Sequence, residues 1–197
     1  MCSWCWGFAP TLAEVSRNLS ADAAVRYIMG GLARDSNEPM PEDVRDYVQN
    51  AWREVAATTG VSFNWDFWEK CQPRRSTYPA CRAVIAAGLQ GASPAMFSAL
   101  QRAYYAEARN PSDEGTHLDL AGDLGLEVGK FREDLRSPKV EALLQEDFMK
   151  RRELGVREFP SLLFHTDESV HAIVRGWAPR DDVFERLRRV RELRSDH

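Results

Sequence analysis

Apolar positions along the chain recur mostly three or four residues apart, which is the spacing of one helix face. The first such stretch, residues 8–19, predicts a helix that Cys2 caps, with Pro10 near its first turn. Residues 23–29 are instead rich in β-branched and aromatic side chains, and two glycines follow them directly. This composition predicts a buried strand between the first helix and a polar, proline-containing loop.

From residue 41 to residue 154 the helical spacing is almost unbroken, which predicts an all-α block. Thr116 and Asp119 have the spacing of a capping box and predict the start of a short helix. Aromatic side chains recur along this block, and at helical spacing they indicate a packed core rather than a cofactor cleft. Proline is favoured in the first turn of a helix and marks three further helix starts, at Pro41, Ser93-Pro94 and Ser137-Pro138.

The spacing of apolar residues changes after Gly155. Two short apolar runs, residues 161–165 and 170–175, flank a polar turn and predict a β-hairpin. Pro179 then opens a terminal helix with apolar residues on one face and a basic run that indicates a solvated face. The predicted order of elements is therefore helix, strand, helical block, hairpin, helix.

A polar loop near residue 37 separates the helical block, residues 37–155, from two flanking parts, residues 1–36 and 156–197. With 197 residues and 44% hydrophobic side chains, the chain can bury a sizeable core. The net charge is −4 and both signs are interspersed, which argues against nucleic acid or an anionic membrane surface as the main partner. No apolar run is long enough to cross a bilayer.

Cys2 and Cys5 are separated by two residues just before the first predicted helix. The unpaired N–H groups and the macrodipole at a helix N-terminus favour an anion, so we expect Cys2 to be the thiolate and nucleophile and Cys5 its resolving partner. Half of a zinc site and two structural cysteines remain as other interpretations. Zinc would need a second close pair, whereas Cys71 and Cys81 are separated by nine residues with no histidine nearby. The spacing therefore favours a redox dithiol without a metal.

Only Met1 precedes the first cysteine, so the sequence as given has no signal peptide and predicts a cytoplasmic protein. Stable structural disulfides are rare in the cytoplasm. Cys71 and Cys81 admit two interpretations. They are a second redox pair if the loop between them brings their Cα atoms within about 7 Å, and otherwise two reduced structural thiols.

A Cys-x-x-Cys motif at a helix start, a proline ahead of a late hairpin and an inserted helical block resemble the DsbA branch of the thioredoxin superfamily. The resemblance covers essentially the whole chain. The segment from Tyr78 to Arg82 also resembles kappa-class glutathione transferases and hydroxychromene-carboxylate isomerases, which usually keep a serine at the active helix. Residues 71–81 are most similar to DsbA-family proteins described as predicted protein-disulfide isomerases. The most specific segments are Cys2-Ser-Trp-Cys5, Gly155-Val-Arg-Glu-Phe-Pro160 and Tyr78-Pro-Ala-Cys-Arg82.

The resemblance implies an α/β protein with a thioredoxin fold and an inserted all-α helical domain. It implies that Cys2 is the exposed nucleophile, Cys5 the buried resolving thiol and Pro160 a cis-proline that faces them. Such a proline turns the backbone of the preceding residue towards a substrate peptide, which then pairs through main-chain hydrogen bonds. The substrate-binding residues implied in this way are Ser3, Trp4, Phe159, Tyr78 and Pro79.

We therefore expect a dithiol–disulfide oxidoreductase of the protein-disulfide oxidase or isomerase type, acting on protein or peptide thiols. No cofactor is expected, although glutathione is a possible co-substrate that Arg74, Arg75, Ser76 and Thr77 could bind by a carboxylate. An arginine pair in a polar loop is more often a solvated face. One alternative is a glutathione-dependent transferase or isomerase acting on a small electrophile. The other is a non-catalytic thioredoxin-fold binding protein.

The superfamily places a hydrophobic strand immediately before the Cys-x-x-Cys helix, in the middle of the sheet, whereas this sequence begins at Met1. A central strand supplies main-chain partners to two others. We therefore expect the first central strand to be missing, because Met1 is an internal methionine of a longer protein. The sheet should then have about three strands, with a slot beside residues 23–29.

Overall fold

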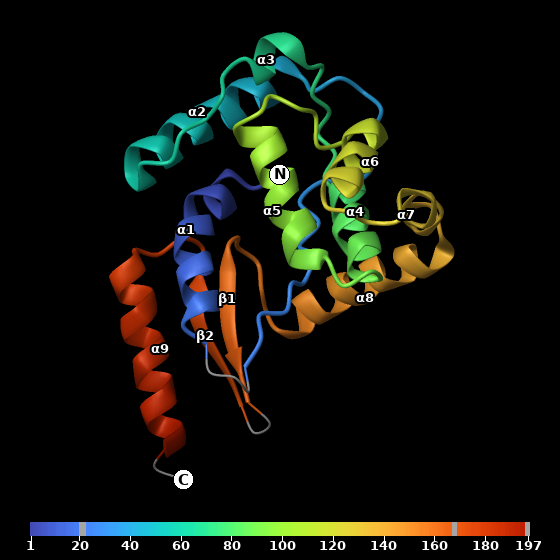
Figure 1. Cartoon of the computed structure of the whole chain (residues 1–197). Helices are drawn as coiled ribbons and strands as arrows, with labels where there is room; N and C mark the ends of the chain where they lie inside the picture. The colour runs from blue at the N-terminus through green and yellow to red at the C-terminus, as the bar shows by residue number, and fades with distance from the viewer. Residues whose placement is uncertain (20–22, 167–168, 196–197) are drawn as a thin grey trace. The chain divides into compact units, whose positions relative to one another are not determined.

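The structure is a computed structural model and describes residues 1–19, 23–166 and 169–195. Along these residues, every helix is too short or too polar to cross a membrane. The elements follow one another (Figure 1) as α1 (Ser3–Arg17), α2 (Glu42–Thr59), α3 (Phe67–Lys70), α4 (Tyr78–Gly88), α5 (Ser93–Tyr105), α6 (Glu114–Asp123), α7 (Val128–Leu135), α8 (Pro138–Glu153), β1 (Ser161–His165), β2 (Val170–Arg175) and α9 (Arg180–Ser195).

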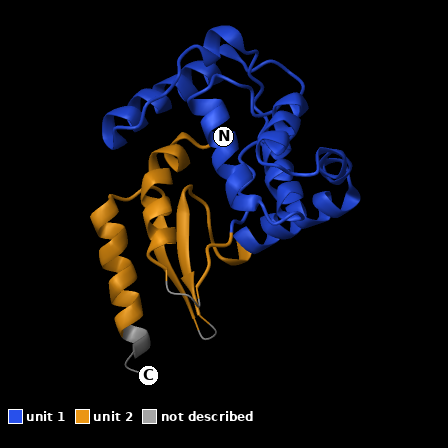
Figure 2. Cartoon of the chain, viewed as in Figure 1, with its two compact units in different colours: residues 1, 27–151 blue, residues 2–26, 152–197 orange. Residues whose placement is uncertain are grey.

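The chain forms two compact units, each with its own hydrophobic core (Figure 2). Unit 1 consists of residue 1 and residues 27–151, and unit 2 consists of residues 2–26 and 152–197. The sequence placed the two boundaries after residues 36 and 155. In the structure the units divide after residues 26 and 151, which is ten and four residues earlier. The helices α2 to α7 and nearly all of α8 belong to unit 1, and the strands belong to unit 2.

Unit 2 contains α1, the hairpin of β1 and β2, and α9. The strands are antiparallel, with Ser161 opposite Arg175 and His165 opposite Val170, so the predicted hairpin is confirmed. The predicted terminal helix is confirmed as α9. Pro10 lies inside α1 rather than in its first turn, because the helix already begins at Ser3. The buried core of this unit consists of Phe8, Val15, Ile173, Val174, Ala178, Val183 and Leu187.

The predicted strand at residues 23–29 is wrong, because this segment is irregular in the structure. A strand exists only where another strand supplies main-chain partners, and composition alone cannot provide them. The N–H group of Met29 instead donates to the side-chain oxygen Oδ2 of Asp147 at 3.0 Å. The described residues form a two-stranded sheet rather than the expected three strands, so no slot lies beside a strand at residues 23–29.

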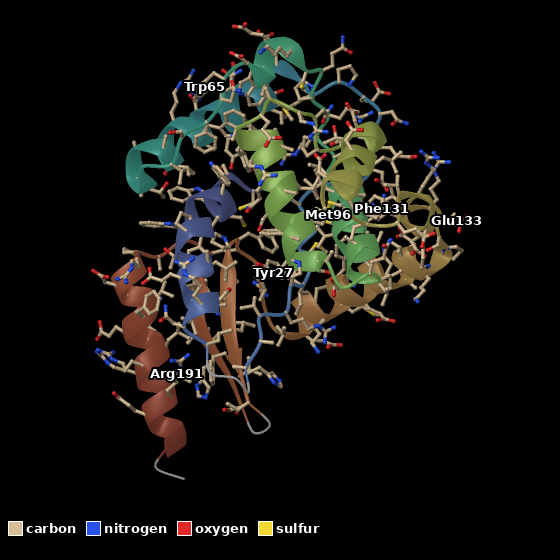
Figure 3. All side chains as sticks on the ribbon, viewed as in Figure 1. Tyr27, Trp65, Met96, Phe131, Glu133 and Arg191 are labelled. Atoms are coloured by element: carbon tan, nitrogen blue, oxygen red, sulfur yellow. The ribbon has the colours of Figure 1, made fainter. Side chains whose placement is uncertain are left out.

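Unit 1 is helical, as the spacing predicted, and α4 packs against α5, α6 and α7. The alanine-rich face of α4 lets its neighbours approach closely, and Met96 and Phe131 fill the space around it without solvent exposure (Figure 3). The predicted start of α8 is confirmed by Ser137, whose Oγ accepts the N–H of Val140 at 3.2 Å.

The predicted capping box at Thr116 and Asp119 is wrong. The helix α6 begins at Glu114 with Asp113 as its N-cap residue, so Thr116 lies inside the first turns and is buried. The reason is local, because Asn110 already forms a turn in which its Oδ1 accepts the N–H of Ser112 at 3.1 Å. This turn starts the helix earlier than the sequence signal indicated.

A second part of unit 1 is built from aromatic rings around Trp52, which is fully buried. The ring of Trp52 stacks on Phe63 with centroids 4.9 Å apart and meets Tyr104 edge-on at 5.4 Å. The expectation that these stripes form core is therefore confirmed for Trp52, Tyr104 and Tyr105, whereas it is wrong for Tyr47, which is exposed. The rings in contact with Trp52 belong to Phe63, Trp65, Phe67, Trp68, Tyr104 and Tyr105.

We predict that Trp52→Ala lowers the free energy of unfolding by about 3–5 kcal/mol, since it removes a large buried ring and leaves a cavity. The measurement is urea unfolding followed by circular dichroism. Tyr47→Ala on the same helix is the control, because Tyr47 is 67% exposed and its loss should change stability by less than about 0.5 kcal/mol. Equal shifts for the two variants would contradict the role of Trp52.

Candidate active site

The first turn of α1 is organised by the sulfur atom of Cys2. Cys2 is the N-cap residue, with φ −89° and ψ 112°, and its Sγ accepts the N–H of Cys5 at 3.2 Å. A side-chain acceptor at this position satisfies one of the main-chain donors that a helix leaves unpaired at its start. The expectation that Cys2 caps the helix is confirmed.

The two thiols at this helix start differ in acidity. The pKa of Cys2 is lowered, first by a hydrogen bond from the Cys5 thiol and also by the N–H of Cys5, and burial opposes these effects. The pKa of Cys5 is raised well above its usual value by the same hydrogen bond and by burial. Cys2 is therefore the thiol of the pair that loses its proton first, which is the division of roles that a nucleophile and a resolving thiol require.

The segment before β1 reaches Cys2 from the other end of the chain. The peptide bond between Phe159 and Pro160 is cis, and the Cys2 thiol donates to the carbonyl oxygen of Phe159 at 3.6 Å. Pro160 is buried and Phe159 is half-buried. The structure thus brings Cys2, Cys5, Phe159 and Pro160 together within unit 2.

The two residues between the cysteines have different environments. Ser3 is 9% exposed, whereas Trp4 is half-buried. The ring of Trp4 contacts the ring of Trp177, with centroids 5.8 Å apart. Sequence reasoning missed Trp177 as a site residue. Its signal was weak, a single aromatic residue directly after the glycine that ends the second predicted strand.

Tyr78 and Pro79, expected as substrate-binding residues, belong to unit 1 and form the first turn of α4. The ring of Tyr78 packs on Phe148 with centroids 4.9 Å apart. The N-cap residue Thr77 is fixed to Ala33 by three hydrogen bonds. Its hydroxyl donates to the Ala33 carbonyl at 3.0 Å and accepts the Ala33 N–H at 2.9 Å, and its own N–H donates to the same carbonyl at 3.1 Å. The start of α4 is therefore held firmly inside its own unit.

Cys71 and Cys81 also belong to unit 1. The Cys71 thiol donates to the carbonyl oxygen of Ala108 at 3.2 Å, and burial raises its pKa. Burial raises the pKa of the Cys81 thiol to about 11. All four cysteines of the chain are free thiols in the structure. A second redox pair formed by Cys71 and Cys81 therefore stays a prediction.

Arg74 is engaged within unit 1. Its guanidinium donates to the carbonyl oxygen of Ser112 at 2.9 Å and forms an ion pair with Asp113, while Arg75 is exposed. In addition, the hydroxyl of Ser112 donates to the carbonyl oxygen of Ser76 at 2.8 Å. Arg74, the cation expected to bind a carboxylate of glutathione, is therefore already paired with the carboxylate of Asp113 in the same unit. Among the described residues, no group of three His, Cys, Asp or Glu side chains is placed to hold a metal ion.

Comparison with known proteins gives relatives over most of the chain. SpxH of Bacillus subtilis, named a ClpXP adapter protein, is 27% identical over 177 residues, which cover 86% of this chain and 58% of SpxH. SpxH of Halalkalibacterium halodurans is 26% identical, with 85% of this chain and 56% of the relative covered. The chain therefore spans little more than half the length of the curated relatives that it matches.

Two solved structures match almost the whole chain. A proposed protein disulfide isomerase from Nitrosomonas europaea is 28% identical with a TM-score of 0.87, and the match covers 98% of this chain and 94% of the other. The cytosolic disulfide reductase DsbM from Pseudomonas aeruginosa, also solved with GSH, is 26% identical with a TM-score of 0.79, covering 98% and 95%.

The family model Thioredoxin_5, described as thioredoxin, matches residues 1–181 and thus includes the dithiol, the helical unit and the hairpin. The match therefore covers both ends of the site, from Cys2 and Cys5 to Phe159 and Pro160. With the match to this model and the likeness to disulfide isomerase and reductase structures, the chain belongs to the thioredoxin family as a DsbA-like member.

Proposed function

We propose that the protein is a thiol–disulfide oxidoreductase in which Cys2 is the nucleophile and Cys5 the resolving thiol. One observation carries the proposal. The Cys2 sulfur accepts the N–H of Cys5 at a helix start, and the two thiols have pKa values shifted in opposite directions. Only the thiolate is a good nucleophile in disulfide exchange, so this arrangement supports attack by Cys2 rather than by Cys5.

The reaction proceeds in two exchanges. The Cys2 thiolate attacks one sulfur of a substrate disulfide, a bond forms between these two sulfurs, and the second substrate sulfur leaves as a thiolate that takes up a proton. Cys5 then gives up its proton and attacks Cys2, which releases the first substrate sulfur as a thiol. The substrate gains two electrons and two protons, and the protein is left with a disulfide between Cys2 and Cys5.

The main chain at Phe159 supports the choice of a peptide substrate. In the reduced state its carbonyl oxygen accepts the Cys2 thiol at 3.6 Å. When Cys2 loses its proton this carbonyl loses its donor, so a main-chain N–H of an extended substrate can take the vacated position. Pairing of this kind gives affinity through the backbone and leaves selection to side chains.

The likeness to DsbM supports disulfide reduction as the direction of the reaction. A stabilised Cys2 thiolate is a good leaving group, so it favours the dithiol and by itself makes the protein disulfide oxidising. Net reduction of a substrate therefore requires a reductant in excess that keeps the protein in the dithiol form. Two molecules of glutathione regenerate it, since one forms a mixed disulfide with Cys2 and the second releases oxidised glutathione. The GSH-bound DsbM structure and the cytosolic location in its name support this reductant and a cytoplasmic protein here.

A second candidate function is that of a protein-binding adapter. The observation in its favour is the likeness to SpxH proteins, which are named ClpXP adapters. An adapter acts by binding, so its function would survive replacement of both Cys2 and Cys5 by serine. An oxidoreductase would lose its function in the same double variant, and the two candidates are separated by this result.

We predict that Cys2 is alkylated by iodoacetamide much faster than Cys5. The rate of Cys2 labelling should fall as the pH drops through a pKa that lies below that of an ordinary cysteine thiol. In Cys5→Ala the inflection should move to higher pH, because the Cys5 thiol is the largest cause of the lowered pKa of Cys2. The measurement is mass spectrometry of the labelled peptides between pH 4 and pH 10. Faster labelling of Cys5 would contradict the assignment.

We predict that Cys2→Ser abolishes the reduction of insulin disulfides in the presence of glutathione, since no other thiol of the chain has a lowered pKa. Cys5→Ser should instead accumulate a mixed disulfide between Cys2 and the substrate, visible on a non-reducing gel. Ser16→Ala, an exposed position on the same helix, is the control and should retain activity. Full activity of Cys2→Ser would overturn the proposed mechanism.

A further inference from the structure

Trp177 follows Gly176 at the end of β2, and its ring contacts the ring of Trp4. The centroids are 5.8 Å apart and the ring planes are inclined by 44°, within the range in which aromatic rings attract one another. Trp4 stands between Cys2 and Cys5 in the first turn of α1. A residue from the end of the hairpin therefore touches the residue that separates the two cysteines.

The position of Trp177 is fixed by the elements around it. Its ring packs against the hydrophobic core of unit 2. Gly176 has φ +75°, and a Cβ atom there would lie 3.0 Å from a carboxylate oxygen of Glu158, so glycine is required for this turn. In addition, Arg175 donates from Nη1 to the carbonyl oxygen of Gly155 at 2.7 Å. These contacts hold the end of β2 against the segment that leads to Phe159.

Both indoles keep part of their surface in contact with solvent, since Trp4 and Trp177 are half-buried. Phe159, whose carbonyl oxygen accepts the Cys2 thiol, is also half-buried. Three partly exposed aromatic residues thus come from three segments that meet at the dithiol. Large apolar side chains that stay partly exposed beside a reactive group are available for contact with a ligand, in addition to any packing against the core.

We propose that Trp177 is a positioning residue that fixes the indole of Trp4, and that the two rings form an apolar surface beside Cys2. The side chain next to the reacting half-cystine of a substrate peptide packs on this surface. The site therefore selects peptide disulfides with an aromatic residue beside the half-cystine over those with a small polar residue. This inference rests on the proposed thiol–disulfide activity and names its substrate class.

The expected selectivity follows from the energetics of ring contacts. Contact between an aromatic substrate side chain and the indoles adds a stabilisation that corresponds to about a three- to tenfold increase in rate constant. A small polar side chain makes no such ring contact, so its rate constant is not increased. The substrate backbone does not contribute to this difference, because its pairing with Phe159 is the same for both peptides. Selectivity between two such peptides therefore isolates the indole surface.

The test uses two disulfide-linked homodimeric peptides that differ only in having Phe or Ser beside the cysteine. The full chain is reduced, mixed with each peptide, and the second-order rate constant is followed by the loss of free protein thiols. The unsubstituted protein should react about three- to tenfold faster with the Phe peptide. Trp177→Leu should bring the ratio of the two rate constants close to one, and Trp177→Phe should restore most of it.

Trp4→Leu should lose the same preference, and the double variant with Trp177→Leu should lose no more than either single change, because the rings act as one surface. The matched control is Trp65→Leu. Trp65 is 39% exposed, belongs to unit 1 and also contacts another indole, that of Trp52. This variant should keep both the rate constants and their ratio.

A preference that persists in Trp177→Leu overturns the inference, as does an unsubstituted protein that reacts equally with both peptides, and in both cases the oxidoreductase function stands. An unsubstituted protein that reacts with neither peptide overturns the proposed function and this inference with it. If thermal unfolding shows that Trp177→Leu does not fold, the other two variants decide the matter. Trp177→Phe must then keep the preference and Trp4→Leu must lose it.

Discussion

The site depends on one hydrogen bond, from the N–H of Cys5 to the sulfur of Cys2 at 3.2 Å. A helix leaves its first N–H groups without internal partners, and a sulfur at the N-cap position satisfies one of them best when it carries negative charge. The same geometry places Cys5 one turn further along, where its hydrogen bond to Cys2 and its burial both disfavour its thiolate. The helix start and the contact between the two thiols thus make two identical side chains chemically different.

This hydrogen bond persists only if α1 is held rigidly, and the core of unit 2 provides that. Phe8 and Val15 of α1 are buried together with Ile173 of β2 and Val183 of α9. The hairpin packs in the same core as α1, and Phe159 lies just before its first strand. Packing of this core therefore brings the carbonyl oxygen of Phe159 to Cys2. Stability and site geometry therefore come from the same contacts.

Local signals in the sequence predicted local structure well. The dithiol at a helix start, the proline-marked starts of α2, α5 and α8 and the hairpin before α9 all depend on neighbouring residues, and they are present. The strand at residues 23–29 failed because a strand depends on a partner elsewhere in the chain. Trp177 was missed for the same reason, since its contact with Trp4 joins residues far apart in sequence.

The hydrogen bonds inside unit 1 limit how glutathione can be recognised. Arg74 already pairs with Asp113, and Thr77 already shares three hydrogen bonds with Ala33, so a carboxylate of glutathione would have to displace internal partners there. Displacing a satisfied ion pair gains little, because one charge–charge contact replaces another. Arg75, the neighbouring cation of residues 74–77, is exposed to solvent. In the proposed reaction, glutathione would therefore be recognised less by the Arg74 guanidinium than by thiol exchange at Cys2 and by the main chain at Phe159.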